Sequence, residues 1–239
     1  MTNLEQVLYE KIREVMLTWD EEDIYAASFF VYSNEMFRFR DYDNVSTFAV
    51  SYNTEADCEG AGIHSEERWN YAFWRQNEHP IIEADDNCPE MQLLFDWYRE
   101  QGIENIGEET GDWENGPVGY KELVNLAAKV ARRFQDEGFL MQKFGKPIPI
   151  IIHDLEYCEC TLKATEFANP KGEAADFLYG NWESAPAEKG VLPADPKAAA
   201  KKFAEELASD PQKLEQFYGR SPGISREMIE EMLKRILNS

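Results

Sequence analysis

Hydrophobic residues recur at three- and four-residue spacing along the first segment of the chain. They share one face of a helix: Leu4, Val7, Leu8, Ile12, Val15 and Met16. This spacing is typical of an amphipathic helix that packs one side against a core. The run WDEED at positions 19–23 follows it and marks its end.

Two segments rich in aromatic and β-branched residues come next. They cover positions 24–33 (IYAASFFVYS) and 45–52 (VSTFAVSY), with a polar segment between them. Such composition favours β-strands. Because the two segments are neighbours in the sequence, we predict that they form an antiparallel pair.

The stretch SEERWNYAFW at positions 65–74 places four aromatic residues beside charged ones. Ser65 is a good helix N-cap, and the two glutamates after it suit the first turn of a helix. A proline at position 80 limits its length. We therefore predict a helix that runs from position 66 to about position 77.

The side chains of this expected helix divide into a buried set and a polar set. Trp69 and Phe73 are four residues apart, with Ala72 beside them, so these three are predicted to face the interior. The polar set includes Glu67 and Arg68. A charged pair beside buried rings is either bonded structurally or lines a pocket, because unpaired burial of a charge costs several kcal/mol. The sequence leaves both readings open.

Further elements are expected beyond position 80. Pro89 begins a helix that Gly102 ends, and a glycine-rich loop at 107–119 leads into a longer helix that stops at Gly138. The apolar run PIPIIIH at 147–153 predicts a buried strand. The following residues up to position 168 are consistent with another helix.

The pattern of elements predicts the fold class and the domains. We expect an α+β domain over residues 1–183, with a small, mainly antiparallel sheet packed by several helices. The segment 184–196 (SAPAEKGVLPADP) has the composition of a linker. Three helix-like segments follow, so residues 197–239 are expected to form a helical C-terminal extension.

The composition limits the possible classes of protein. Of the 239 residues, 43% are hydrophobic, which excludes a disordered chain, and no apolar run approaches the length of a membrane span. The amino terminus is acidic where a secretory signal would be basic. We therefore expect a soluble cytoplasmic protein. Reduced thiols are expected at all four cysteines: Cys58, Cys88, Cys158 and Cys160.

The net charge of −22, from 46 acidic and 24 basic side chains, points to a basic partner. Such a chain repels nucleic acids and anionic membranes. Eleven of the acids lie within positions 83–114, where Arg99 is the one basic residue. This segment is either a solvated face or a binding surface. The residues predicted to contact a partner are Glu108, Glu109, Asp112, Trp113 and Glu114, with an exposed Trp113 as anchor or, alternatively, folded back on the core.

Catalytic and metal-binding motifs give little support to an enzyme. No nucleophile elbow, phosphate loop or dinucleotide signature is present. A metal site drawn from His153, Cys158 and Cys160 does not have the spacing of a structural zinc site, so we expect no metal and no cofactor. His153 is the best acid or base candidate. A possible pocket would combine six residues: Asn53, Glu55, Glu67, Arg68, His153 and Glu156.

Several separated pieces of the chain resemble the bacterial family catalogued as domain of unknown function 4303. They are the strand at 25–32, SYNTE at 51–55, ERWNYAFW at 67–74, HDLEY at 153–157 and Asn169–Pro170. The resemblance covers about residues 1–183, and the tail departs from the family pattern. It implies a cytoplasmic bacterial protein without established chemistry. Families of this type often accompany secreted polymorphic toxins as immunity proteins.

Three functional hypotheses follow. The first is a non-enzymatic acidic binding protein, an immunity protein that neutralises a basic toxin effector, because an acidic inhibitor finds a basic toxin quickly through electrostatic steering. The second is a hydrolase or small-ligand protein with a pocket near Glu67, Arg68 and His153. The third is a docking role for the C-terminal helices.

Overall fold

The computed structural model describes residues 4–58, 60–63, 65–111 and 116–181, together with Leu214, Arg226, Leu233 and Lys234. The chain divides into two compact units, residues 1–185 and residues 186–239. The four described residues of the second unit have helical backbone. The linker expected at 184–196 and the rest of the expected extension lie outside the described residues.

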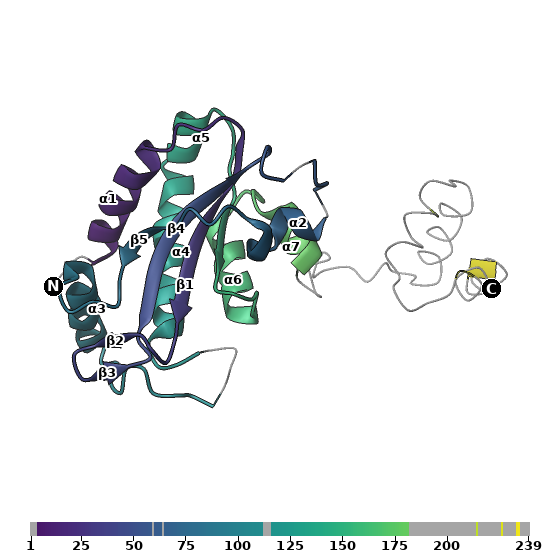
Figure 1. Ribbon diagram of the computed structural model, residues 1–239. Coiled ribbons are helices and arrows are strands. Elements are labelled where there is room, and N and C mark those ends of the chain that lie inside the picture. Colours follow the sequence, from purple (N-terminus) through teal and green to yellow (C-terminus); the bar gives the residue numbers. More distant parts are fainter. Residues whose placement is uncertain are drawn as a thin grey trace. The chain divides into compact units, whose positions relative to one another are not determined.

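The first unit is built on a four-stranded sheet with the order β5-β4-β1-β6 (Figure 1). Its strands are β1 (Ile24–Ser33), β4 (Ser46–Thr54), β5 (His79–Ile82) and β6 (Ile150–His153). β4 is antiparallel to both β1 and β5, whereas β6 is parallel to β1. A separate two-stranded hairpin joins β2 (Arg38–Phe39) to β3 (Tyr42–Asp43). The predicted α+β class, the mainly antiparallel sheet and the β1–β4 pairing are confirmed.

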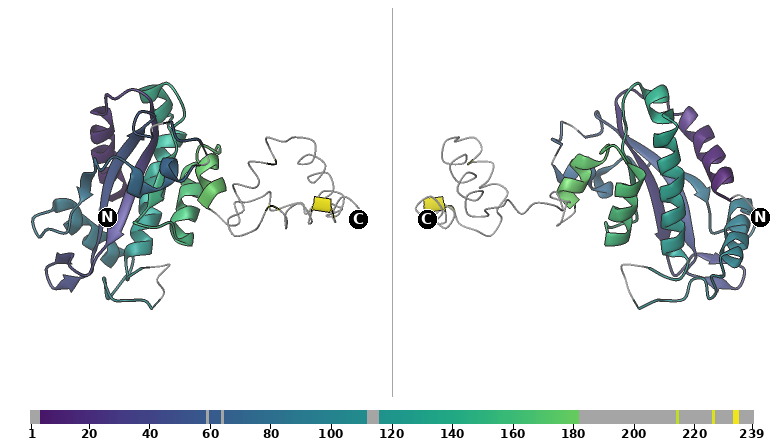
Figure 2. Two further views of the ribbon diagram at one scale, coloured as in Figure 1. Left: turned by 45° about the vertical axis from the view of Figure 1, so that its right-hand side comes forward. Right: turned by 180° about the vertical axis from the view of Figure 1, so that it is seen from behind.

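Helices cover one face of the sheet. The larger ones are α1 (Leu4–Leu17), α3 (Pro89–Glu100), α4 (Tyr120–Asp136) and α6 (Glu159–Ala168), and α5 (Phe139–Phe144) is shorter. α7 (Ala175–Asn181) belongs to the opposite face, where Phe177 and Leu178 are buried in a second hydrophobic group. Seen from behind, α4 lies along the sheet between α1 and α6 (Figure 2). The helices expected at the amino terminus, after Pro89 and before Gly138 are confirmed.

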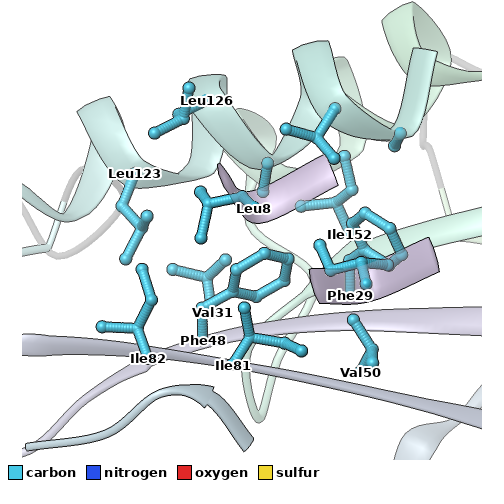
Figure 3. Close-up of a cluster of buried hydrophobic side chains, with 14 of the residues drawn as sticks. Leu8, Phe29, Val31, Phe48, Val50, Ile81, Ile82, Leu123, Leu126 and Ile152 are labelled. Atoms are coloured by element: carbon cyan, nitrogen blue, oxygen red, sulfur yellow. The ribbon is translucent and has the colours of Figure 1, made fainter. Parts of the chain in front are cut away.

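The main core lies between the sheet and these helices. Alternate residues of β1, such as Phe29 and Val31, point to this side, as period-two geometry requires. Leu123 and Leu126 of α4 point down onto them, as Figure 3 shows. The alternation in the strands and the helical periodicity of α4 therefore meet in one aliphatic layer.

A second hydrophobic group, the aromatic cluster, lies on the other face of the sheet. Its buried members are Tyr25, Ala26, Cys58, Trp69, Tyr71, Trp74, Ile151, Leu162, Ala174, Phe177 and Leu178. Ile151 belongs to it while Ile150 and Ile152 belong to the main core, so β6 contributes to both. The sheet thus separates two cores of different composition.

The predicted helix over positions 66–77 is wrong. α2 covers only Glu66–Trp69, and a 3-10 turn, η1 (Tyr71–Phe73), follows it. Asn70 separates the two with extended backbone (ψ 117°), and its side-chain oxygen accepts from the amide of Ala72 at 3.0 Å. Asparagine offers the backbone such local bonds in competition with helix, which is why the helix ends here. Ser65 makes no side-chain cap bond to α2.

The burial predicted from helical spacing is wrong in the same stretch. Trp69 is buried as expected, but Ala72 and Phe73 are exposed. Tyr71 and Trp74 take their place in the interior. The break at Asn70 rotates the following residues relative to a continuous helix, so the buried set changes.

Five elements were not expected, namely β2, β3, β5, α5 and α7. α6 also begins at Glu159, five residues later than the expected start at position 154. The reason is local, because a side-chain oxygen of Asp154 accepts from the amide of Glu156 at 2.7 Å and holds a turn. The strand expected at 147–153 is confirmed as β6, although it is limited to its last four residues.

Candidate functional site

A cleft of about 670 Å³ lies between the β2–β3 hairpin, α3 and the segment 103–108. Four aromatic residues are among those that line it, and we call them its floor, although Tyr42 is partly exposed: Phe39, Tyr42, Phe95 and Tyr98. The ring of Phe95 lies 4.7 Å from that of Phe39 and 4.9 Å from that of Tyr42, measured between centroids. Because Phe39 and Tyr98 are almost fully buried, this floor is part of the packed unit.

The walls of the cleft depend on unusual backbone. Arg40, Asn44 and Asn105 all have positive φ, between 54° and 59°, and Gly107 has φ 84°. A Cβ atom at Gly107 would lie 1.9 Å from the carbonyl oxygen of Asp43, so only glycine allows the segment to pass this close to β3. The side chain of Asn44 donates to the carbonyl of Gly107 at 3.3 Å. These contacts hold the segment against the hairpin.

The two arginines of the cleft are both engaged by α3. Arg40 donates to the side-chain oxygen of Gln92, and its guanidinium lies 4.9 Å from the ring centroid of Phe39. Gln92 in turn donates to Asp96 at 2.9 Å, and Asp96 forms an ion pair with Arg99. Arg99 is therefore paired with a carboxylate, whereas Arg40 is held through the neutral amide of Gln92.

The carboxylates of the cleft stand mainly at its rim. They are Asp41, Asp43, Glu104 and Glu108, and all four are exposed. Asp43 pairs with Arg38 at 2.5 Å on the surface. Four carboxylates against two arginines leave the lining with a formal charge of −2. The cleft is thus aromatic below and acidic above.

The acidic segment around the cleft is mostly solvent-exposed. Nine of its eleven acids are described, and seven of them are exposed: Glu83, Asp85, Asp86, Glu100, Glu104, Glu108 and Glu109. The other two are half-buried and paired, Glu90 with Lys11 and Asp96 with Arg99. A negative field therefore extends beyond the cleft.

Of the predicted partner-contacting residues, two are placed by the structure. Glu108 lines the cleft, and Glu109 accepts from the side-chain amide of Asn44 at 2.8 Å. Asp112, Trp113 and Glu114 lie outside the described residues. The structure therefore places Glu108 in the lining of the cleft and Glu109 beside Asn44, directly after β3.

Three of the six predicted pocket residues meet on the other side of the sheet. Arg68 is buried and donates two hydrogen bonds to the carboxylate of Glu55, at 2.8 and 2.7 Å. This guanidinium lowers the pKa of the Glu55 carboxyl. Its carbon lies 4.0 Å from the ring centroid of Tyr25, whose hydroxyl accepts from Asn53 at 2.9 Å. The group is a bonded, packed structure.

His153 is sealed within the fold. It has no exposed surface, and burial lowers its pKa to about 4. The contact of Nδ1 with the carbonyl oxygen of Asp154, at 2.6 Å, requires a proton on Nδ1, so the hydroxyl of Ser28 donates to Nε2 at 2.7 Å. Both ring nitrogens are thus occupied. Glu67 and Glu156, the other two pocket residues, are exposed at the surface.

Within the described ranges, no three potential metal-ligating side chains come together. No helix among the described residues is long and apolar enough to cross a membrane.

The cleft was missed by sequence reasoning. The glycine at 107 and the asparagine at 44 were visible signals for tight backbone, but nothing in the spacing linked them across more than sixty positions.

Fold and cleft define an acidic α+β protein with an aromatic-floored cleft. Comparison of the chain with family models, with curated proteins and with solved structures finds no significant match. The resemblance to the family numbered 4303 stays a prediction.

Proposed function

We propose that this chain is a non-enzymatic binding protein that takes a basic segment of a protein partner at the cleft. The observation that carries the proposal is the combination of four rim carboxylates with a floor of four aromatic rings in one cleft. A lysine or arginine side chain matches both parts, since its charge pairs with carboxylates and is also attracted to ring faces.

The wider charge distribution supports this proposal. Exposed carboxylates on α3 and the segments beside it attract a basic partner over a distance of about one Debye length, roughly 8–10 Å at physiological salt. Such steering raises the association rate and suppresses acidic competitors. Nucleic acids and anionic membranes are therefore poor candidates as partners.

The identity of the partner rests on the resemblance described above. An immunity protein for a basic toxin effector, acting in the cytoplasm, would use the same chemistry, because many toxin domains that attack nucleic acids are basic. The rim of the cleft would then cover the basic surface with which the toxin holds its substrate. The resemblance and the charge argument are independent of each other.

A hydrolase or small-ligand function near Glu67, Arg68 and His153 has less support. His153 is fully buried and both of its ring nitrogens are bonded, so a substrate has no access to the imidazole in this conformation. Arg68 is already bidentate with Glu55. We therefore retain the binding function alone.

The test is a charge reversal at the rim. The triple variant Asp41→Lys, Glu104→Lys, Glu108→Lys is titrated with fluorescent decalysine and decaarginine peptides at two salt concentrations. We expect roughly tenfold weaker binding and a smaller salt dependence. The melting temperature should change little, because all three side chains are exposed.

A matched control separates the cleft from net charge. The variant Glu14→Lys, Asp20→Lys, Glu22→Lys makes the same charge change at exposed positions in α1 and in the segment after it. α1 ends beside α5, at the other end of the sheet from β2 and β3 (Figure 1). This control should weaken binding far less. Equal losses in the two variants would show that the peptides respond to overall charge, and the cleft would lose its assigned role.

A further inference from the structure

We infer that Cys158 and Cys160 form a redox-active dithiol that a hydroperoxide oxidises to an intramolecular disulfide. The two sulfur atoms are in contact in the folded chain, with Sγ of Cys158 3.0 Å from Sγ of Cys160. A disulfide bond is about 2.05 Å long, so the sulfurs need to approach by only about 1 Å. This site is independent of the cleft and of the proposed binding function.

The position of the pair in the fold favours reaction of Cys158. Cys158 is the N-cap residue of α6, a helix of ten residues, and Cys160 lies in its first turn. The amino end of a helix stabilises negative charge and therefore a thiolate. Cys158 is buried, whereas Cys160 is half-buried and borders the solvent. A small oxidant is therefore favoured over a bulky one.

The neighbours of Cys158 also stabilise its thiolate. The thiol of Cys160 donates to this sulfur and lowers the pKa of Cys158, and Thr161 acts in the same direction. Burial and the carboxylate of Asp154 oppose the effect. The same contact raises the pKa of Cys160. Cys158 is thus the expected nucleophile, and Cys160 is the expected resolving cysteine.

The reaction balances with the hydroperoxide as oxidant. The Cys158 thiolate attacks one oxygen of hydrogen peroxide, so that an S–O bond forms, the O–O bond breaks and hydroxide leaves. The sulfur of Cys160 then attacks the sulfenic sulfur, the S–S bond forms, and the hydroxyl group leaves as water with the proton of Cys160. The hydroxide takes up the proton that Cys158 released when it ionised, so two thiols lose two electrons and the peroxide becomes two waters.

The other two cysteines lack this arrangement and serve as internal controls. The Cys58 sulfur accepts from the side-chain amide of Asn53 at 3.8 Å, and burial raises the pKa of Cys58. The thiol of Cys88 donates to a carboxylate oxygen of Glu90 at 3.5 Å. Cys88 is also the N-cap residue of a helix, α3, so it controls for the effect of the helix end. Both thiols should react more slowly than the pair.

The experiment treats the full-length folded protein with hydrogen peroxide, blocks free thiols with an alkylating reagent and measures masses. Trypsin yields a peptide over residues 144–163 that carries both sulfurs and no methionine. We expect this peptide to lose two hydrogens and to resist alkylation until a reductant is added. Cys58 and Cys88 should stay alkylatable during that time.

Two variants assign the roles. Cys160→Ser should accumulate sulfenic acid at Cys158, detected with a dimedone reagent, because the resolving sulfur is missing. Cys158→Ser should slow oxidation at the site roughly tenfold. Sulfenic acid at Cys58 or Cys88 in place of the pair, or full alkylation of both pair sulfurs after treatment, would overturn the inference.

A comparison with the unfolded chain tests the part played by the fold. The same oxidation in urea keeps the Cys-x-Cys spacing but removes the helix end and the sulfur contact. Disulfide formation should be several-fold faster in the folded protein. An equal or faster rate in urea would show that the sequence spacing alone explains the reactivity, which contradicts a prepared site.

Discussion

On the helix-covered face of the sheet the core is filled mainly by aliphatic and phenylalanine side chains, whereas the opposite face is filled by aromatic rings with polar groups. In the main core, Phe29 and Leu123 contribute no polar atoms and need no hydrogen bonds. In the aromatic cluster, the hydroxyl of Tyr25 and the indole of Trp74 both donate to the carbonyl of Arg68, at 2.6 and 2.9 Å. The two faces are therefore stabilised by different interactions.

The difference explains how a helix of four residues persists. The end of a helix leaves carbonyl groups without intrahelical partners. In α2, side chains from elsewhere in the cluster donate hydrogen bonds to these carbonyls. Tyr25 and Trp74 donate to the carbonyl of Arg68, and the hydroxyl of Tyr157 donates to the carbonyl of Trp69. The rings thus act as both packing and caps, which allows irregular backbone to be buried.

The largest expected effect concerns the main core. Phe29→Ala removes a fully buried ring that packs against Phe48, with centroids 5.4 Å apart, and leaves a cavity under α4. We expect the free energy of unfolding to fall by about 4 kcal/mol. Urea denaturation measures it. A loss below about 1 kcal/mol would mean that this layer repacks freely and is not the dominant core.

The next effect is a dependence of stability on pH in the aromatic cluster. The pKa of His153 is about 4 in the folded protein and about 6.5 in the unfolded chain, because burial disfavours the charged ring. As the pH falls through 6.5, the unfolded chain binds a proton that the folded protein does not, so stability is lost between pH 6.5 and pH 4. The loss is about 3 kcal/mol.

Variants isolate this contribution from that of the carboxylates. Unfolding free energies at pH 7 and pH 4 are compared for the parent, for His153→Gln and for His79→Gln, whose histidine is exposed. The parent and His79→Gln should lose about 3 kcal/mol more on acidification than His153→Gln. Identical losses in all three proteins would contradict the assignment to His153.

A smaller effect compares two tyrosines of the aromatic cluster. The hydroxyl of Tyr25 donates to a backbone carbonyl and accepts from Asn53, whereas the buried hydroxyl of Tyr71 has no hydrogen-bond partner among the described residues. Tyr25→Phe should cost about 1.5 kcal/mol, and Tyr71→Phe should be neutral or stabilising. Thermal and urea unfolding measure both. Equal costs would show that the polar groups do not distinguish the two rings.

The smallest expected effect is at Phe73. Its side chain is 54% exposed, although helical spacing predicted it to be buried. Phe73→Ser should change the unfolding free energy by less than about 0.5 kcal/mol. A cost of several kcal/mol would restore the continuous helix and place Phe73 in the interior.

The main core could be predicted from the sequence because each of its elements is regular. The alternation around Phe29 and the helical periodicity around Leu123 state which face is buried before any contact is known. The aromatic cluster could not be predicted in this way. Its burial depends on one asparagine, Asn70, whose side chain competes with the helix, and on donors such as Tyr157 that are distant in sequence.

The acidic charge of the candidate site could be predicted from the sequence, but its cleft could not. The concentration of acids over positions 83–114 correctly indicated an exposed acidic surface. The cleft itself arises where the hairpin turn at Arg40 meets the segment around Gly107, and each side is held by backbone with positive φ. Such conformations depend on contacts between distant segments, which spacing does not encode.

The close approach at Gly107 also has a kinetic meaning for any partner. Because the segment rests directly on the carbonyl of Asp43, we expect the two walls to keep their separation when a partner binds. The cleft is therefore a preformed binding site, and we expect no closure step on binding. We expect binding to be limited by encounter, with selection by side-chain size, and a methyl group at position 107 would change the fit without altering a single charge.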